Sequence, residues 1–414
     1  MAERSTDQSE QMYAFRRFSL QERDRRWKAV RERMARDGID VIVAPPNTGH
    51  STDWQADMRY LSHCGGGPDS DIACVFPLNA EPTVIAKEAV IRWGPRVQNW
   101  IGDVRDPYRY FGRGIAERLL ELGADGKRIG ICGLSGGTRT PEGAILLGTY
   151  QAIRSAVPNA KLVDATDLLQ EVRCSKSQEE IGVLQASVDL IERAVEAEVE
   201  AAAQPGVRDY EVWAAAISTM LKGGSELSVH FNWIADKEPA RTLTRPQLRP
   251  LEDGDVIDNE LEASVIGYRA QQKRPVAIRT CDPIYVDLME FHGELYERFL
   301  EWLRPGATLG EAVEKTRQLG EQLCPRGGPL AGGGADLHLH GRGLGDDVPL
   351  ATNPETIARF GDWQFPENGV FIIKPGVRAG SRPGFRFAWG DTCRTTPRGT
   401  VRMGKAPHGL LVAR

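Results

Sequence analysis

The strongest constraint on the fold is a long amphipathic segment that begins at Ser177. Ser177 and Glu180 form a capping-box pattern, in which each side chain accepts a hydrogen bond from a backbone N–H group at the start of a helix. The apolar residues behind it recur at helical spacing, as Ile181, Leu184, Val188, Ile191, Val195 and Val199. Pro205-Gly206 ends this pattern. The sequence therefore predicts a long helix with one apolar face.

A repeated pattern indicates that this region contains two similar halves. Pro305-Gly306 precedes Glu311 by the same interval at which Pro205-Gly206 precedes Glu211. Each Pro-Gly pair lies between two predicted helices, over 177–203 and 209–222 in the first case and over 282–303 and 309–324 in the second. The repeat favours two αβ halves that face each other across a sheet. Strand candidates follow at 370–373, 386–389 and 400–402.

The first part of the chain alternates between helix and strand signals. Ser19 caps a predicted helix over 19–38, and Thr140 with Pro141 predicts the start of another over 141–157. Further candidates are a helix over 113–123 and strands over 39–45, 72–76, 83–86 and 128–132. This alternation predicts an α/β domain. A length of 414 residues favours two domains, which we assign to 1–172 and 173–414.

Composition excludes two classes of partner. The net charge of −5 offers no basic excess to neutralise phosphates, so we expect no nucleic-acid partner. No run approaches the ~20 apolar residues that a membrane-spanning helix needs, and the N-terminus has no apolar signal region. The seven cysteines show no CxxC or CxxH spacing, which favours free thiols over a zinc cluster. We therefore expect a cytoplasmic protein without a membrane partner.

Motifs in a fixed order carry a family resemblance over nearly the whole chain. Near the start stands RxxxVRxRMxxDGIDVIVA, and between Val172 and Thr392 follow VRCSKSQEEI, GDVID…GYRAQQKR, LHLHGRGLG, GVFIIKPGV and RFAWGDT. Together they resemble the pita-bread family of creatinase, prolidase and aminopeptidase P. The resemblance implies a creatinase-type N-terminal α/β domain followed by a C-terminal pita-bread α+β domain. It also implies a homodimer, in which residues from 45–70 would reach the partner's active site.

The peptidases of this family bind two metal ions with two Asp, one His and two Glu. At the matching positions this chain has Glu260, Gln271, His340, Lys374 and Gly390. A pair of divalent ions needs several anionic oxygens, and an ammonium group at one ligand position would repel them. We therefore expect no metal and no other cofactor.

Three residues are candidates for catalysis. Glu260 would be a nucleophile or general base whose pKa is raised by burial, or else a carboxylate ion-paired to Lys374. Lys374 would hold a substrate carboxylate or stabilise an oxyanion, unless it forms that same ion pair. His340 would be an acid–base group or a core histidine, and His338 would share its strand face.

Candidates for substrate binding are His230, Gln271, His338, Asp347, Arg241 and Trp389. Arg241 would grip an anionic substrate bidentately. Asp347 stands where the family usually has a second histidine, whereas His230 matches no family position. Trp389 would line the pocket or pack in the core.

The resemblance is strongest to metal-ligand-deficient members such as creatinase and ectoine hydrolase, which also has Glu at the position of Glu260. It implies a metal-independent hydrolase that cleaves a C–N bond in a small polar non-peptide substrate. Two alternatives stay open. One is a metal-independent lyase that removes a proton with Glu260 or His340, and the other is a non-catalytic binding protein.

Overall fold

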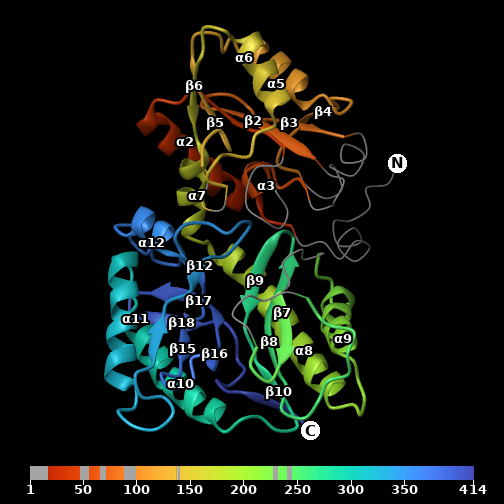
Figure 1. The fold of residues 1–414 in the computed structure, drawn as a ribbon. Helices are drawn as coiled ribbons and strands as arrows, with labels where there is room; N and C mark the ends of the chain where they lie inside the picture. The colour runs from red at the N-terminus through yellow and green to blue at the C-terminus, as the bar shows by residue number, and fades with distance from the viewer. Residues whose placement is uncertain are drawn as a thin grey trace. The chain divides into compact units, whose positions relative to one another are not determined.

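The computed structural model describes residues 17–46, 56–65, 71–87, 99–136, 138, 140–226, 232–239 and 245–414. The chain divides into two compact units. The first comprises Met1–Arg173 together with Leu344–Asp347, and the second comprises Cys174–Gly343 and Val348–Arg414. Both units combine helices with strands (Figure 1), which confirms the predicted α/β class with two domains.

Within the described residues, the first unit contains a six-stranded mixed sheet in the order β4-β3-β2-β1-β5-β6. The strands are β1 (Val41–Ala44), β2 (Ile72–Pro77), β3 (Thr83–Ala86), β4 (Asp103–Arg105), β5 (Arg128–Ile131) and β6 (Lys161–Asp164). The helices are α2 (Leu20–Asp37), α3 (Ala56–Ser62), α5 (Phe111–Glu121), α6 (Leu147–Ala156) and α7 (Thr166–Cys174). Val43, Val75, Ile115 and Ile129 belong to the core that helices and sheet share.

The helix predicted over 141–157 is too long at its N-terminal end. α6 begins at Leu147, and Thr140 does not cap it. Gly143 has a φ of 92°, a conformation that a right-handed helix does not contain. The backbone N–H groups of Ala144 and Ile145 donate to the carbonyl of Gly133. These longer-range hydrogen bonds hold the segment as a loop, although Pro141 suits a helix start.

The second unit opens with α8 (Gln178–Ala202) and α9 (Asp209–Lys222), and its later helices are α10 (Ile284–Trp302), α11 (Leu309–Leu323) and α12 (Pro354–Phe360). One sheet has the order β19-β10-β8-β7, with β9 paired to β8; its strands are β7 (Asn232–Asp236), β8 (Val256–Val265), β9 (Tyr268–Gln272), β10 (Val276–Ile278) and β19 (Leu411–Ala413). A second has the order β13-β12-β14-β17-β18, formed by β12 (Leu339–Gly341), β13 (Leu350–Ala351), β14 (Val370–Ile373), β17 (Asp391–Thr396) and β18 (Gly399–Arg402). The third consists of β11 (Gly334–Asp336), β15 (Gly376–Arg378) and β16 (Arg386–Ala388).

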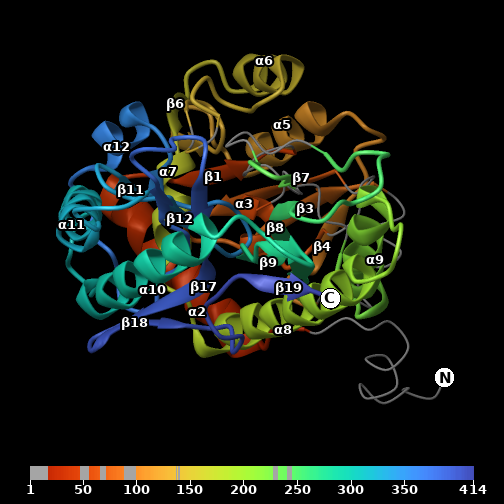
Figure 2. The ribbon, with the colours of Figure 1, turned by 60° about the horizontal axis from the view of Figure 1, so that its bottom comes forward.

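Each half of this unit starts with two helices joined by a Pro-Gly turn, as the repeat predicts. Gly206 and Gly306 have φ values of 72° and 90°, which glycine adopts without steric cost. Both hydrogen bonds of the capping box at Ser177 are present. α8 packs on β8 and β9 (Figure 2), whereas α10 packs beside β15, β16 and β18. Two helix layers thus cover different strands of the unit.

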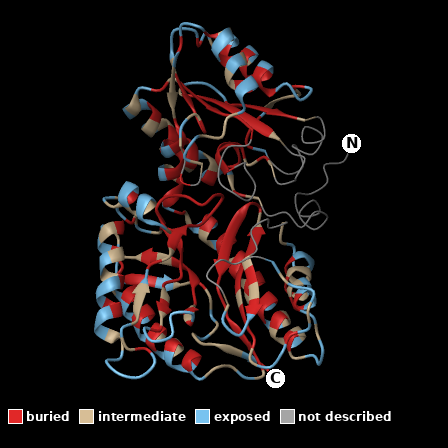
Figure 3. Cartoon of the chain, in the orientation of Figure 1, coloured by how far each residue is buried: buried red, intermediate tan, exposed pale blue. Residues whose placement is uncertain are grey.

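The β8–β9 hairpin holds several predicted site residues in a fixed register. Ile266 and Gly267 form its tight turn with φ values of 43° and 83°, as a two-residue hairpin loop requires. Glu262 lies opposite Gln271 in the ladder. β8, β9 and β14 are almost completely buried (Figure 3), so their side chains have few alternative positions.

Among the helices that the structure describes, none is long and apolar enough to cross a membrane.

Candidate active site

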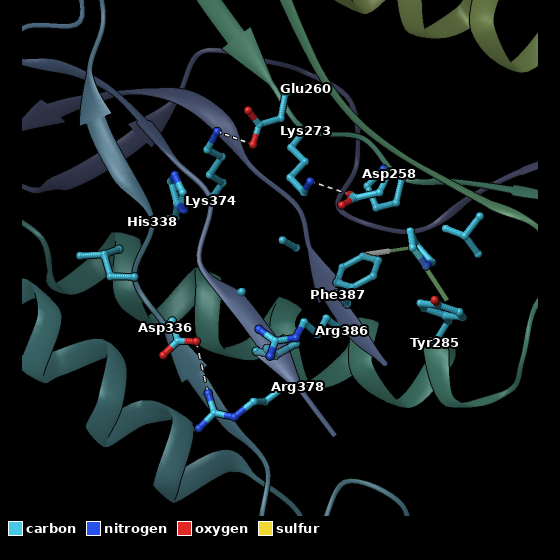
Figure 4. A pocket seen from close by; sticks show the side chains of 17 residues that line it. Asp258, Glu260, Lys273, Tyr285, Asp336, His338, Lys374, Arg378, Arg386 and Phe387 are labelled. Atoms are coloured by element: carbon cyan, nitrogen blue, oxygen red, sulfur yellow. Dashed lines mark hydrogen bonds and ion pairs between the residues drawn. The ribbon is translucent and has the colours of Figure 1, made fainter. Parts of the chain in front are cut away.

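The second unit contains a cavity of about 140 Å³ that is lined by two of the three predicted catalytic residues, Glu260 and Lys374 (Figure 4). It is lined by Pro239, Val256, Asp258, Glu260, Lys273, Pro275, Tyr285, Asp336, Leu337, His338, Lys374, Gly376, Val377, Arg378, Arg386, Phe387 and Ala388. A cavity of about 150 Å³ is large enough for a ligand the size of benzene. The cavity therefore suits a small molecule rather than a folded partner.

Glu260 and Lys374 form a buried ion pair at this cavity. The Lys374 Nζ lies 2.6 Å from Glu260 Oε1. Gln271 connects the two charged groups, because its Nε2 donates to Glu260 Oε2 at 3.1 Å and its Oε1 accepts from Lys374 Nζ at 3.4 Å. Asn232 Nδ2 also donates to Glu260 Oε2, at 2.9 Å. Four side chains thus satisfy one another at this cavity.

The electrostatics of the pair differ from the sequence prediction for Glu260. Burial alone would raise the pKa of Glu260, but the charges of Lys374 and Lys273 hold it well below its ordinary value. The prediction of a raised Glu260 pKa is therefore wrong, whereas the alternative, an ion pair between Glu260 and Lys374, is observed. Burial lowers the pKa of Lys374 to about 8, although Glu260 favours its charged form. Glu260 is thus ionised at neutral pH.

A second ion pair lies beside the first and was missed by the sequence reasoning. Lys273 Nζ lies 2.6 Å from Asp258 Oδ1, and both residues line the cavity. Burial raises the pKa of Asp258, and the Lys273 charge opposes that shift. Asp258 and Glu260 are two residues apart on β8, so their side chains share a face. That period-two spacing is the signal by which the sequence would have indicated Asp258.

The structure brings together four of the predicted residues: Glu260, Lys374, Gln271 and His338. His338 lies just before β12, lines the cavity and is close enough to Glu260 to lower its pKa. His340 lies within β12, is 3% exposed and has its Nδ1 3.2 Å from the carbonyl oxygen of Gly341. His340 is not among the residues that line the cavity. Of the two histidines, only His338 lines this cavity.

Trp389 and Asp347 lie in other surroundings. Trp389 is fully buried, with the guanidinium groups of Arg274 and Arg402 at 3.9 and 4.6 Å from its ring centre. Asp347 belongs to the first unit, where it lies 2.6 Å from Arg173 Nη2. Neither residue lines the cavity. The candidates His230 and Arg241 lie outside the described residues.

The residues at this site do not match the donor set of a two-metal centre. Within the described part of the chain, no group of three or more His, Cys, Asp or Glu side chains could hold a metal ion. The carboxylate of Glu260 is already paired with an ammonium group. A Cβ atom on Gly390 would lie 2.3 Å from the Cβ of Lys374, so a larger residue does not fit beside this lysine. The residues at 374 and 390 are therefore sterically coupled.

Comparisons with known proteins agree with this fold. The Creatinase/Prolidase N-terminal domain profile matches residues 26–175. The profile of metallopeptidase family M24 matches residues 183–401, which is more than half of the 414 residues. The two matches define a protein with a creatinase-type N-terminal domain and a pita-bread domain. The chain belongs to metallopeptidase family M24.

Three relatives illustrate the range of similarity. A creatinase from Bacillus sp. is 25% identical over 407 residues, which cover 95% of this chain and 92% of the creatinase. An Xaa-Pro dipeptidase from Pyrococcus furiosus is 24% identical over 259 residues, covering 62% of this chain and 70% of the dipeptidase. The solved structure of an X-Pro aminopeptidase from Thermotoga maritima has a TM-score of 0.73 at 19% identity, covering 93% of this chain and 99% of that one. The structural likeness shows the fold alone.

Proposed function

We propose that this M24 protein is a metal-independent hydrolase that cleaves a C–N bond in a small, polar, non-peptide substrate. The observation that carries the proposal is the Glu260–Lys374 ion pair at a cavity of about 140 Å³. An ionised carboxylate and an ammonium group can together activate water and stabilise an oxyanion. The similarity to a creatinase over 95% of the chain supports this reaction class.

In the proposed reaction, Glu260 accepts a proton from a water molecule, and the water oxygen attacks the carbon of the C–N bond. Lys374 stabilises the negative charge that develops on the attacked group. His338, which lines the same cavity, donates a proton to the leaving nitrogen as the C–N bond breaks. Glu260 then passes its proton through solvent to His338, so that both side chains regain their starting protonation states and one water molecule is consumed. In this proposal His338 takes the acid role that the sequence suggested for His340.

A metal-dependence assay tests the proposal directly. The purified protein would be dialysed against EDTA and assayed by mass spectrometry on small guanidino and amido compounds that include creatine, with Ala-Pro as the peptide probe. We expect turnover of a non-peptide compound without added metal. Turnover that disappears with EDTA and returns with manganese or cobalt would contradict metal independence, and cleavage of Ala-Pro alone would contradict the substrate class.

A Glu260→Gln variant tests the role of the carboxylate. Loss of a general base lowers turnover by about 10²-fold or more, so we expect a fall of that size. Glu252→Gln is the matched control, because Glu252 has an exposed side chain outside the cavity, where it pairs with Lys237 at 3.6 Å. Equal turnover in wild type and Glu260→Gln would show that Glu260 is only an ion-pair partner.

The Glu260–Lys374 ion pair also favours a second candidate function, that of a non-catalytic binding protein. In that case the pair would fill the site without taking part in a reaction, and no compound would be turned over. The lyase alternative is separated by isotope labelling. In ¹⁸O-labelled water, a hydrolase introduces the label into its product, whereas a lyase does not.

A further inference from the structure

The charges around the cavity do not cancel. Its lining contains three carboxylates, Asp258, Glu260 and Asp336. It also contains four cationic side chains, Lys273, Lys374, Arg378 and Arg386. Each carboxylate has its own cation: Glu260 pairs with Lys374 at 2.6 Å, Asp258 with Lys273 at 2.6 Å, and Asp336 with Arg378 at 3.2 Å. Arg386, the fourth cation, therefore has no carboxylate partner in the cavity lining. Among the described residues, its side chain has no ion pair or hydrogen bond.

The strand register adds a second, geometric observation. Arg378 on β15 lies directly opposite Arg386 on β16. Like charges opposite each other on neighbouring strands destabilise a sheet, so this pair has an energetic cost in the absence of an anion. Asp336 offsets the charge of Arg378, because it lies on the other neighbouring strand, β11. No such carboxylate compensates Arg386 among the residues that line the cavity.

Figure 4 shows Arg386 apart from the Glu260–Lys374 pair, on the side of the cavity where Asp336 and Arg378 lie. A ligand in the cavity would therefore meet two chemically different ends. One end has the carboxylate and ammonium of the proposed reaction. The other has a guanidinium, whose planar donors match the two oxygens of a carboxylate.

We infer that Arg386 is the anion-binding residue of this cavity and that the substrate is a small monocarboxylate. The carboxylate is bound by Arg386, and the C–N bond lies toward Glu260 and Lys374. The inference deepens the proposed function by naming the substrate class. Binding at Arg386 itself needs no hydrolysis, so it can be measured separately.

The test compares two ligands of the same shape but different charge. Butyrate and its neutral isostere butyramide would be titrated into the full-length protein by calorimetry at constant ionic strength, with the melting temperature as a second readout. We expect butyrate to bind and butyramide to bind much more weakly. In Arg386→Gln, we expect butyrate affinity to fall by about tenfold or more, as for loss of a charge-assisted hydrogen bond.

Two further variants make the test specific. Arg382→Gln is the matched control, because Arg382 is a half-exposed arginine outside the cavity, paired with Asp282 at 2.9 Å; it should bind butyrate as wild type does. Arg386→Lys keeps a charge without the planar donors, so it should retain part of the affinity. Circular dichroism would verify that each variant is folded, and Arg386→Lys also serves if Arg386→Gln does not fold.

Three results would overturn the inference: no preference for butyrate over butyramide in the wild type, unchanged butyrate affinity in Arg386→Gln, or loss of affinity in Arg378→Gln but not in Arg386→Gln. These outcomes are distinct from failure of the proposed function. Selective butyrate binding without turnover of any compound would keep the anion site and reject the hydrolase.

Discussion

Lys374 is subject to two opposed effects at the scale of a single residue. Burial disfavours its charged form, whereas the Glu260 carboxylate at 2.6 Å favours it. Burial is the larger effect, and the pKa of Lys374 falls to about 8. Lys374 is therefore charged at neutral pH but loses its proton within a range in which other lysines keep theirs.

This pKa predicts how stability changes in alkaline solution. Between pH 8 and the ordinary lysine pKa of 10.5, the unfolded chain holds a proton that the folded protein has released. Because the unfolded state binds more protons, this residue contributes a rise in unfolding free energy with pH, of at most about 1.4 kcal/mol per pH unit. Urea unfolding at pH 7.5, 9 and 10 would measure the rise, which Lys374→Met should remove.

Lys237→Met is the control for that experiment, since Lys237 has a side chain that is 62% exposed. Its pH profile should match that of the wild type. A Lys374→Met profile with the same slope as wild type would mean that another group is responsible for the rise.

At the scale of elements, the site depends on a close approach between the residue after β14 and the residue before β17. The backbone N–H of Lys273 donates to the Gly390 carbonyl, and the N–H of Gly390 donates to the Lys273 carbonyl. Gly390 also packs against Lys374, where an added Cβ would be 2.3 Å from the Lys374 Cβ. The absence of a side chain at 390 therefore lets the strands hold both lysines at the cavity.

Gly390→Ala should consequently destabilise the protein. Overpacking of a buried site costs about 1–3 kcal/mol, and here backbone atoms as well as a side chain would have to move. Gly376→Ala is a matched control, because a Cβ at Gly376 would meet no atom within 4 Å. Chemical denaturation of the two variants would measure the difference. Equal unfolding free energies would contradict the close approach.

Local signals predicted the elements better than they predicted the site. The helix expected over 177–203 is observed at Gln178–Ala202, because its capping box and apolar period depend only on neighbouring residues. The helix start expected at Pro141 was wrong, because backbone hydrogen bonds to the Gly133 carbonyl hold that segment as a loop. Asp258 and Arg386 were missed for a related reason. The spacing of Asp258 from Glu260 places both on one face of β8, but the pairing of Asp258 with Lys273 and the position of Arg386 at the cavity depend on which strands meet there, and that does not follow from a local pattern.

At the scale of the whole molecule, the first unit includes a short segment from the later part of the chain. Leu344–Asp347 belongs to the first unit although the surrounding sequence belongs to the second. Arg173 connects this segment to the rest of the first unit, because its guanidinium pairs with both Asp57 and Asp347. All three side chains are almost completely buried. One buried cation thus holds two carboxylates that are far apart in the sequence.

Arg173→Met should therefore cost far more stability than a typical surface change. Removing one partner of a buried ion pair costs about 3–5 kcal/mol, because it leaves a buried charge uncompensated. Arg33→Met is the control, since Arg33 pairs with Glu171 at a more exposed position in the same unit. Guanidinium unfolding would compare them. Similar unfolding free energies for the two variants would show that the Arg173 network contributes little.

The separate position of Leu344–Asp347 in the sequence has a consequence for protein engineering. A fragment that stops at residue 172 omits Arg173 and also lacks Leu344–Asp347, so it would leave Asp57 without its buried counter-charge. Exchange of N-terminal modules between related proteins would meet the same problem at a single-cut boundary. A graft of the whole first unit would have to include a matched 344–347 segment, because that unit is formed by two separate stretches of the chain.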